Sequence, residues 1–175
     1  MHILVIYDDG AARRQAILLR ERLQRFLGRD CEFEFVWSQI QQLQDNQFVA
    51  EAVSVAQESD LVIVALSNAA WVSRGFRHWV AGWERRPLNK QSAIALLTDQ
   101  SSKHTSRDQL PIVRALKRLA DSCGIPFTHS EFVSPERGKP AGDEGKPQSR
   151  GSEMVRRIRD DLTMAEAPVR WGINE

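Results

Sequence analysis

The sequence predicts an α/β domain built on a doubly wound, five-stranded parallel sheet in three layers, with the strand order 2-1-3-4-5. Five short apolar segments alternate with longer segments of helical period, and such alternation implies right-handed crossovers between parallel strands. Three of the apolar segments are nearly unbroken runs of Ile, Val, Leu and Ala, as in strands covered by helices on both faces. The 175 residues suffice for one domain with its own hydrophobic core.

The expected strands differ in pattern according to their place in the sheet. The first, third and fourth are the continuous apolar runs, whereas the second (CEFEFVW) and the fifth (FTHSEF) alternate as edge strands do. The five strands are expected at residues 3–7, 32–37, 61–66, 93–97 and 126–132.

Four amphipathic helices are expected between these strands. Gly28 ends the first and Pro87 ends the third, because glycine is favoured at a helix C-terminus and proline cannot continue a helix. The helices are expected at residues 11–28, 46–59, 68–86 and 107–124.

The composition changes after the fifth strand. Residues 134–151 contain three Pro, four Gly and seven charged residues, which predicts a mobile loop. Residues 152–167 carry apolar side chains at helical spacing and predict a fifth helix beside the first. We therefore expect one domain over residues 1–165 and a C-terminal tail at 166–175.

The charge balance and the cysteine count exclude several classes of function. Lys and Arg number 24 against 23 Asp and Glu, so no net field favours nucleic acid or a membrane surface. Two cysteines, Cys31 and Cys123, are too few for a disulfide framework or a zinc cluster. There is no signal-peptide pattern, and the longest apolar run is too short to span a membrane. We expect a cytoplasmic protein.

Ligands of doubly wound sheets bind beyond the carboxyl ends of the strands, and several polar residues are expected there. This candidate ligand edge comprises Asp8, Asp9, Gly10, Ser67, Asn68 and Thr98. The acidic pair resembles that of response-regulator receiver domains, which use such a pair to hold Mg²⁺. Those domains also need an aspartate after the third strand and a lysine in the fifth, and this chain has Ser67 and no lysine there. The resemblance therefore implies at most a Mg²⁺-dependent switch at Asp8 and Asp9.

A longer resemblance links residues 60–85, from the third strand into the following helix, to flavodoxins and flavodoxin-like NAD(P)H:FMN reductases. It implies a flavodoxin-like fold and an FMN phosphate held by Ser, Thr and Gly after the first strand. This chain has DDGAAR at that point, and two carboxylates repel a phosphate. Alternatively, an aspartate there caps the first helix while Gly10 permits the tight turn. We predict no cofactor, with FMN or Mg²⁺ as alternatives.

The expected third helix carries two parallel apolar stripes, one of which contains Trp71, Trp79 and Trp83. Either these tryptophans pack against neighbouring helices, or they form an exposed strip that, with Arg74 and Arg77, contacts a protein partner or a second copy. One helix cannot bury two parallel apolar stripes against a single sheet. We therefore expect the exposed strip that contacts a protein partner or a second copy.

No catalytic constellation is visible in the sequence. The four histidines have no metal-ligand spacing, and no nucleophile-elbow, P-loop or dinucleotide motif occurs. The sequence thus favours a non-catalytic flavodoxin-like protein that acts by protein–protein interaction in signalling or regulation. The alternatives are a divergent flavin- or nucleotide-dependent oxidoreductase and the Mg²⁺-dependent receiver-like switch.

Overall fold

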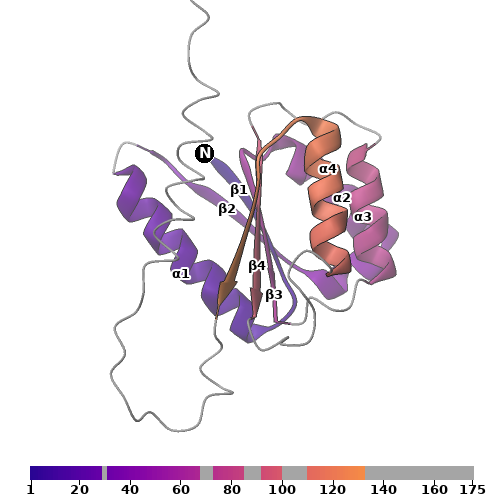
Figure 1. The fold of residues 1–175 in the computed structure, drawn as a ribbon, viewed down its shortest axis with the longest axis horizontal. Helices are drawn as coiled ribbons and strands as arrows, with labels where there is room; N and C mark the ends of the chain where they lie inside the picture. The colour runs from indigo at the N-terminus through magenta and orange to yellow at the C-terminus, as the bar shows by residue number, and fades with distance from the viewer. Residues whose placement is uncertain (29–30, 68–72, 85–91, 100–109, 133–175) are drawn as a thin grey trace, which may run out of the picture.

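Five parallel strands form a single sheet in the order β2-β1-β3-β4-β5, which confirms the predicted fold class (Figure 1). The computed structural model describes residues 1–28, 31–67, 73–84, 92–99 and 110–132. The strands are β1 (His2–Tyr7), β2 (Glu34–Gln39), β3 (Leu61–Leu66), β4 (Ala93–Asp99) and β5 (Phe127–Phe132). Asn68, Trp71 and the predicted loop, fifth helix and tail lie outside the described residues.

Burial follows the position of each strand in the sheet. Every residue of β3 and β4 is buried, as their continuous apolar sequences predict. Edge strand β2 has only exposed and half-buried residues, and β5 is half-buried except at Phe132. The parallel register aligns Leu66 with Thr98 and Thr98 with Glu131. The carboxyl ends of the strands therefore meet at one edge, where the candidate ligand residues gather.

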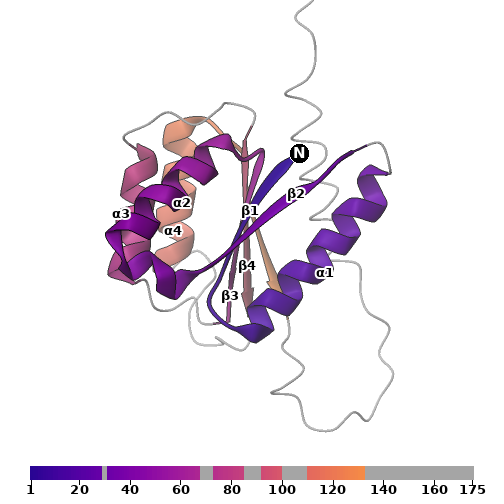
Figure 2. The same cartoon turned by 180° about the vertical axis from the view of Figure 1, so that it is seen from behind.

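The helices divide between the two faces of the sheet (Figure 2). Helix α1 (Gly10–Leu27) lies on one face, and its residues Ala12, Ala16, Leu19 and Leu23 pack against Ile3, Val5 and Ile63. The helices on the other face are α2 (Asn46–Glu58), α3 (Arg74–Glu84) and α4 (Pro111–Cys123). Because successive strand residues point to opposite faces, Leu4 and Val64 belong to this second core.

One short helix is not predicted by the sequence pattern. The 3₁₀ helix η1 (Ile40–Gln44) follows β2 directly, and Ile40 and Leu43 are buried in it. The side chain of Gln42 accepts a hydrogen bond of 2.9 Å from the backbone N–H of Gln39 and so closes the start of the turn. Its five residues are too few to show a helical period, which is why the pattern does not reveal it.

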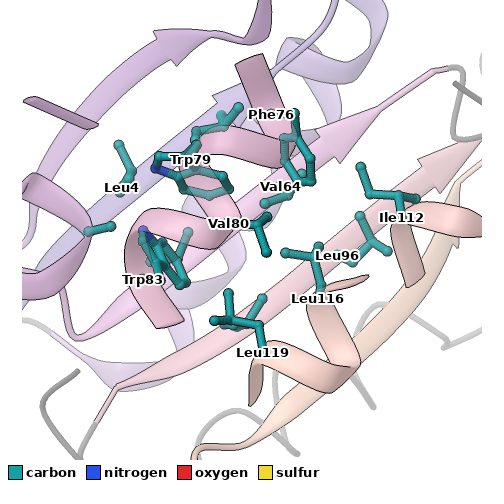
Figure 3. Packing of buried hydrophobic residues seen from close by; sticks show 14 of the residues in the cluster. Leu4, Val64, Phe76, Trp79, Val80, Trp83, Leu96, Ile112, Leu116 and Leu119 are labelled. Atoms are coloured by element: carbon teal, nitrogen blue, oxygen red, sulfur yellow. The ribbon is translucent and has the colours of Figure 1, made fainter. Parts of the chain in front are cut away.

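Helix α3 sits in close contact with η1, α2 and α4, and this packing corrects one expectation. Trp79 and Trp83 are completely buried, with ring centroids 4.6 Å apart, so an exposed tryptophan strip is wrong for these two residues (Figure 3). The expectation considered the sheet alone, whereas α3 also has a neighbouring helix on each side. The alternative interpretation, tryptophans packed in the core, is the correct one for this pair.

None of the helices in the described ranges has the length and apolar character needed to cross a membrane.

Candidate functional site

The first half of the candidate ligand edge is a network of hydrogen bonds around the acidic pair. Asp9 is the N-cap of α1, and its Oδ1 accepts from the backbone N–H of Ala12 at 2.9 Å. The hydroxyl of Ser67 donates to the same oxygen at 2.8 Å. Asp9 therefore caps helix α1, which is the alternative role considered for an aspartate at this point.

Asp8 ties the loop after β1 to the end of β3. Both of its carboxylate oxygens accept from the backbone N–H of Ser67, at 3.0 and 2.9 Å. The side-chain amide of Gln41, in η1, donates to the backbone carbonyl of Asp8 at 2.8 Å. These bonds join three elements at the topological switch point between β1 and β3, where ligands of this fold class are held.

The arrangement has a direct consequence for anion binding. A helix N-terminus binds phosphate because its free N–H groups point at the ligand. At α1 the carboxylate of Asp9 already accepts from one of these groups, and the carboxylate of Asp8 lies on the adjoining loop. A phosphate entering here would have to displace one negative charge and approach another.

Gly10 has a different role from the one the sequence predicts. It is the first residue of α1 and is not among the glycines with positive φ, which in the described ranges are Gly28 and Gly124. A Cβ added to Gly10 would meet only the Nη1 atom of Arg14, at 3.6 Å, an ordinary contact. The turn therefore does not require glycine, because the N-cap supplies the extended conformation that redirects the chain.

The second half of the edge joins Thr98 to His129 of β5. Thr98 Oγ1 and His129 Nε2 form a hydrogen bond of 2.8 Å, and Thr98 is buried at the end of β4. Alternate residues of a strand share one face of the sheet. Thr98 therefore lies on the same side as Leu96, and His129 on the same side as Phe127, which is the side covered by α4. Strand alternation is the signal that could have found the pair.

The described residues at this edge offer no third metal ligand beside Asp8 and Asp9. No cluster of three or more His, Cys, Asp or Glu side chains suited to a metal ion occurs there. Asp8 and Asp9 instead accept hydrogen bonds from backbone and hydroxyl groups.

A groove runs along the outer seam between α2 and α3, and we call it the α2–α3 groove. Two adjoining hollows of about 450 and 480 Å³ form it, and Asn46 and His78 line both. Its apolar lining consists mainly of Val49, Ala50, Val53, Ala81 and Gly82. Arg74 lines the end near η1, and Arg74, Arg77 and His78 are exposed on α3.

Two glycines bring α3 against η1 and α2. A Cβ on Gly75 would lie 1.8 Å from the backbone oxygen of Leu43, and one on Gly82 would lie 2.6 Å from Val53 Cγ2. Only glycine allows this approach at both positions. The sequence shows the glycines but not that the helix they serve borders a groove.

Comparison with known proteins adds the class of fold. No family model matches the chain, and a search of curated proteins gives no match. Among solved structures, an oxidoreductase from Corynebacterium diphtheriae aligns at 14% identity and a TM-score of 0.52, over 95% of this chain and 96% of that one. Together with the strand order, this likeness defines a flavodoxin-like α/β fold.

Two further structures align with lower scores. Smu.1420 from Streptococcus mutans UA159 is 10% identical, with a TM-score of 0.49 over 93% of this chain and 100% of that chain. The capsular polysaccharide assembling protein CapF from Staphylococcus aureus is 12% identical, with a TM-score of 0.49 over 93% of this chain and 49% of that chain.

Proposed function

We propose that this protein acts by binding a protein partner, in a signalling or regulatory role, and that the partner docks in the α2–α3 groove. The observation that carries the proposal is an apolar floor that adjoins the exposed cationic side chain of Arg74. Val49, Val53 and Ala81 line one hollow with apolar surface, Arg74 lines the adjoining hollow, and His78 lines both. Among the described residues that line the groove, none is a carboxylate.

The composition of the groove indicates the chemistry of the partner. Arginine is enriched where protein surfaces meet, because its guanidinium forms paired hydrogen bonds with carboxylates. Arg77 adds a third exposed basic side chain on the same helix. A partner segment with apolar side chains toward the floor and Asp or Glu toward Arg74 would complement this surface.

The carboxyl edge of the sheet supports a role without flavin chemistry. The Asp9 carboxylate accepts the N–H of Ala12 that an FMN phosphate would need, and Asp8 adds negative charge beside it. Both aspartates belong to the hydrogen-bond network that closes the loop after β1. Binding FMN would require that network to open.

The test compares proteins retained from an extract of the native cells by three immobilised forms. These are the wild type, the double variant Arg74→Glu/Arg77→Glu and the matched reversal Arg22→Glu/Arg118→Glu on exposed positions of α1 and α4. We expect a protein retained by the wild type and the matched control and lost from the α3 variant. Melting curves of all three forms check that the fold is intact. Identical retention by all three forms, or none by the wild type, would contradict the proposal.

A second candidate is an oxidoreductase with a rebuilt cofactor site. Two observations favour it: the fold shared with the C. diphtheriae oxidoreductase, and the Thr98–His129 pair at the edge where ligands of such sheets bind. Titration of the wild type with FMN, followed by its visible absorption, separates the two candidates. Saturable binding together with NAD(P)H-dependent bleaching of the flavin would replace the first proposal by this one.

A further inference from the structure

Strand β2 is an edge of the sheet that pairs with β1 alone in the described part of the chain. Its parallel register runs from His2 opposite Glu34 to Tyr7 opposite Gln39, so its other side faces away from the sheet. Val36, at the middle of the strand, is 40% exposed. An edge strand with free backbone N–H and C=O groups is a template for pairing with another strand.

Phe33, which directly precedes β2, and Phe35 and Trp37 within it form a ladder of aromatic rings on the α1 side of the sheet, next to Tyr7 of β1. The centroids of Phe33 and Phe35 are 6.1 Å apart, those of Phe35 and Trp37 are 6.3 Å apart, and Tyr7 meets Trp37 at 6.2 Å. These rings are only half-buried at the margin of the core. A half-buried aromatic ladder along an edge strand is apolar area that a partner strand would cover further.

Arginines of α1 also lie over the ladder, in addition to the apolar side chains of the core against which its rings pack. The Arg13 guanidinium lies 5.7 Å from the Trp37 ring centre, and that of Arg20 lies 5.8 Å from the Phe35 ring. Trp and Arg are the residue types most enriched at the energetic centres of protein interfaces.

We infer that β2 pairs with β2 of a second copy of this chain, antiparallel, across a two-fold axis at Val36. This interface lies away from the α2–α3 groove and does not depend on the proposed partner. Two copies related in this way form one continuous sheet. The pairing occupies the β2 edge of each copy, so it closes at a dimer.

The residue types along β2 favour this register over one centred on Glu34. With the axis at Val36, Glu34 lies opposite Ser38 of the second copy, and Phe35 lies opposite Trp37. An axis at Glu34 would instead place two exposed carboxylates directly opposite each other, which is unfavourable. The Val36 register therefore avoids like charges and extends the aromatic ladder across the interface.

Three of the devices that keep edge strands apart do not occur within β2. Natural edges are commonly protected by lysine, proline or a bulge. The strand sequence EFVWSQ has neither lysine nor proline, and its register with β1 is unbroken over six residue pairs. The backbone of β2 is therefore regular enough to pair with a further strand.

Disulfide trapping tests the register in the full chain, in a Cys31→Ser/Cys123→Ser background that removes the native thiols. Directly opposed residues of antiparallel strands have Cβ atoms about 4.5–5.5 Å apart, close enough for cross-linking after a small adjustment. Val36→Cys should therefore form a covalent dimer under mild oxidation. The matched variant Ser38→Cys, on the same strand face, should form at least tenfold less, because Ser38 lies opposite Glu34.

Light scattering gives an independent measurement on the protein without cysteine changes. The wild type should have twice the 19.9 kDa mass of one chain, and Val36→Lys should have the mass of a single chain with an unchanged circular dichroism spectrum. Val36→Thr, which keeps a β-branched side chain, should remain dimeric. A single-chain mass for the wild type at every concentration, or equal cross-linking of the two cysteine variants, would overturn the inference.

Discussion

Asp8 and Asp9 are adjacent in sequence, but their carboxylates bind to different parts of the molecule. Asp9 accepts from the first turn of α1, whereas Asp8 accepts from the backbone of Ser67 after β3. The first bond belongs to local structure and the second to the assembly of the sheet. The same dipeptide thus stabilises both a helix end and a contact between distant segments.

Replacing Asp9 by alanine tests the local contribution. Asp9→Ala removes the N-cap acceptor of α1 and should lower the free energy of unfolding by about 1 kcal/mol, as for other cap residues. Asp9→Ser retains a capping oxygen and should lose less. Urea denaturation of the three proteins measures the difference. Equal midpoints for Asp9→Ala and the wild type would show that the cap contributes nothing.

Trp83 illustrates how a buried aromatic side chain combines a gain and a cost. Its ring is fully buried beside Trp79, yet its indole N–H has no hydrogen-bond partner among the residues that the structure describes. Burial of the ring stabilises the fold, while an unpaired buried donor costs about 1–3 kcal/mol.

Trp83→Ala should lower the free energy of unfolding by about 3–5 kcal/mol, because it leaves a cavity beneath α3. Trp83→Phe should lose less, since it keeps a ring and removes the unpaired N–H. Exposed Arg77→Ala on the same helix is the control and should stay within about 0.5 kcal/mol of the wild type. Chemical denaturation gives all three values. A Trp83→Ala protein as stable as the control would contradict the buried position.

At the scale of elements, α3 is the helix whose position depends most on its neighbours. It contacts α2 and η1 on one side and α4 on the other, and it covers the sheet with Phe76 and Val80. Gly75 and Gly82 set the distance to the η1 and α2 side. This close approach buries the tryptophans and leaves the exposed basic side chains beside the α2–α3 groove.

Gly75→Ala should destabilise the protein by about 1–3 kcal/mol, although alanine is the better helix former, because its Cβ would overlap the backbone of Leu43. Gly10→Ala provides the matched control in α1. A Cβ at this position would make only an ordinary contact with Arg14. The free energy of unfolding of this variant should therefore be unchanged or higher by up to about 1 kcal/mol. Thermal melts of both variants give the comparison. A stabilising effect of Gly75→Ala would show that α3 lies further from η1.

At the scale of the whole molecule, stability is expected to be concentrated in the middle of the sheet. β3 and β4 are buried throughout, and β1 is buried from Ile3 to Ile6. β2 and β5 are the edge strands of the described sheet, each paired with one neighbouring strand, and they remain partly exposed. A strand that breaks few buried contacts when it opens locally has a low free energy of opening, and its amide protons therefore exchange sooner.

Amide hydrogen exchange should therefore be slowest in β3 and β4 and faster in β5. Exchange in β2 depends on the oligomer, since pairing with a second copy would protect its outer amides. The Val36→Lys variant, measured beside the wild type, isolates that contribution, and β2 alone should lose protection in it. Uniform protection of all five strands in the variant would contradict a stability gradient across the sheet.

The sequence determined the features that depend on neighbouring residues in the chain. Continuous runs such as Leu61–Leu66 identified the central strands, and the Asp9 cap and Gly28 marked the ends of α1, because propensity and periodicity are local properties. The strand order followed from alternating elements and the handedness of crossovers, which leaves few topologies.

Only the tertiary structure decided where α3 buries its side chains and which polar groups meet. An amphipathic stripe shows that a helix has an apolar face. How many neighbours cover that face depends on segments far away in sequence, as for the buried Trp79 on a helix that contacts η1, α2 and α4. Likewise, Ser67 meets Asp8 and Thr98 meets His129 only because the parallel register places separate strand ends together. Local sequence sets what each element is, whereas non-local packing sets which of its residues remain accessible for function.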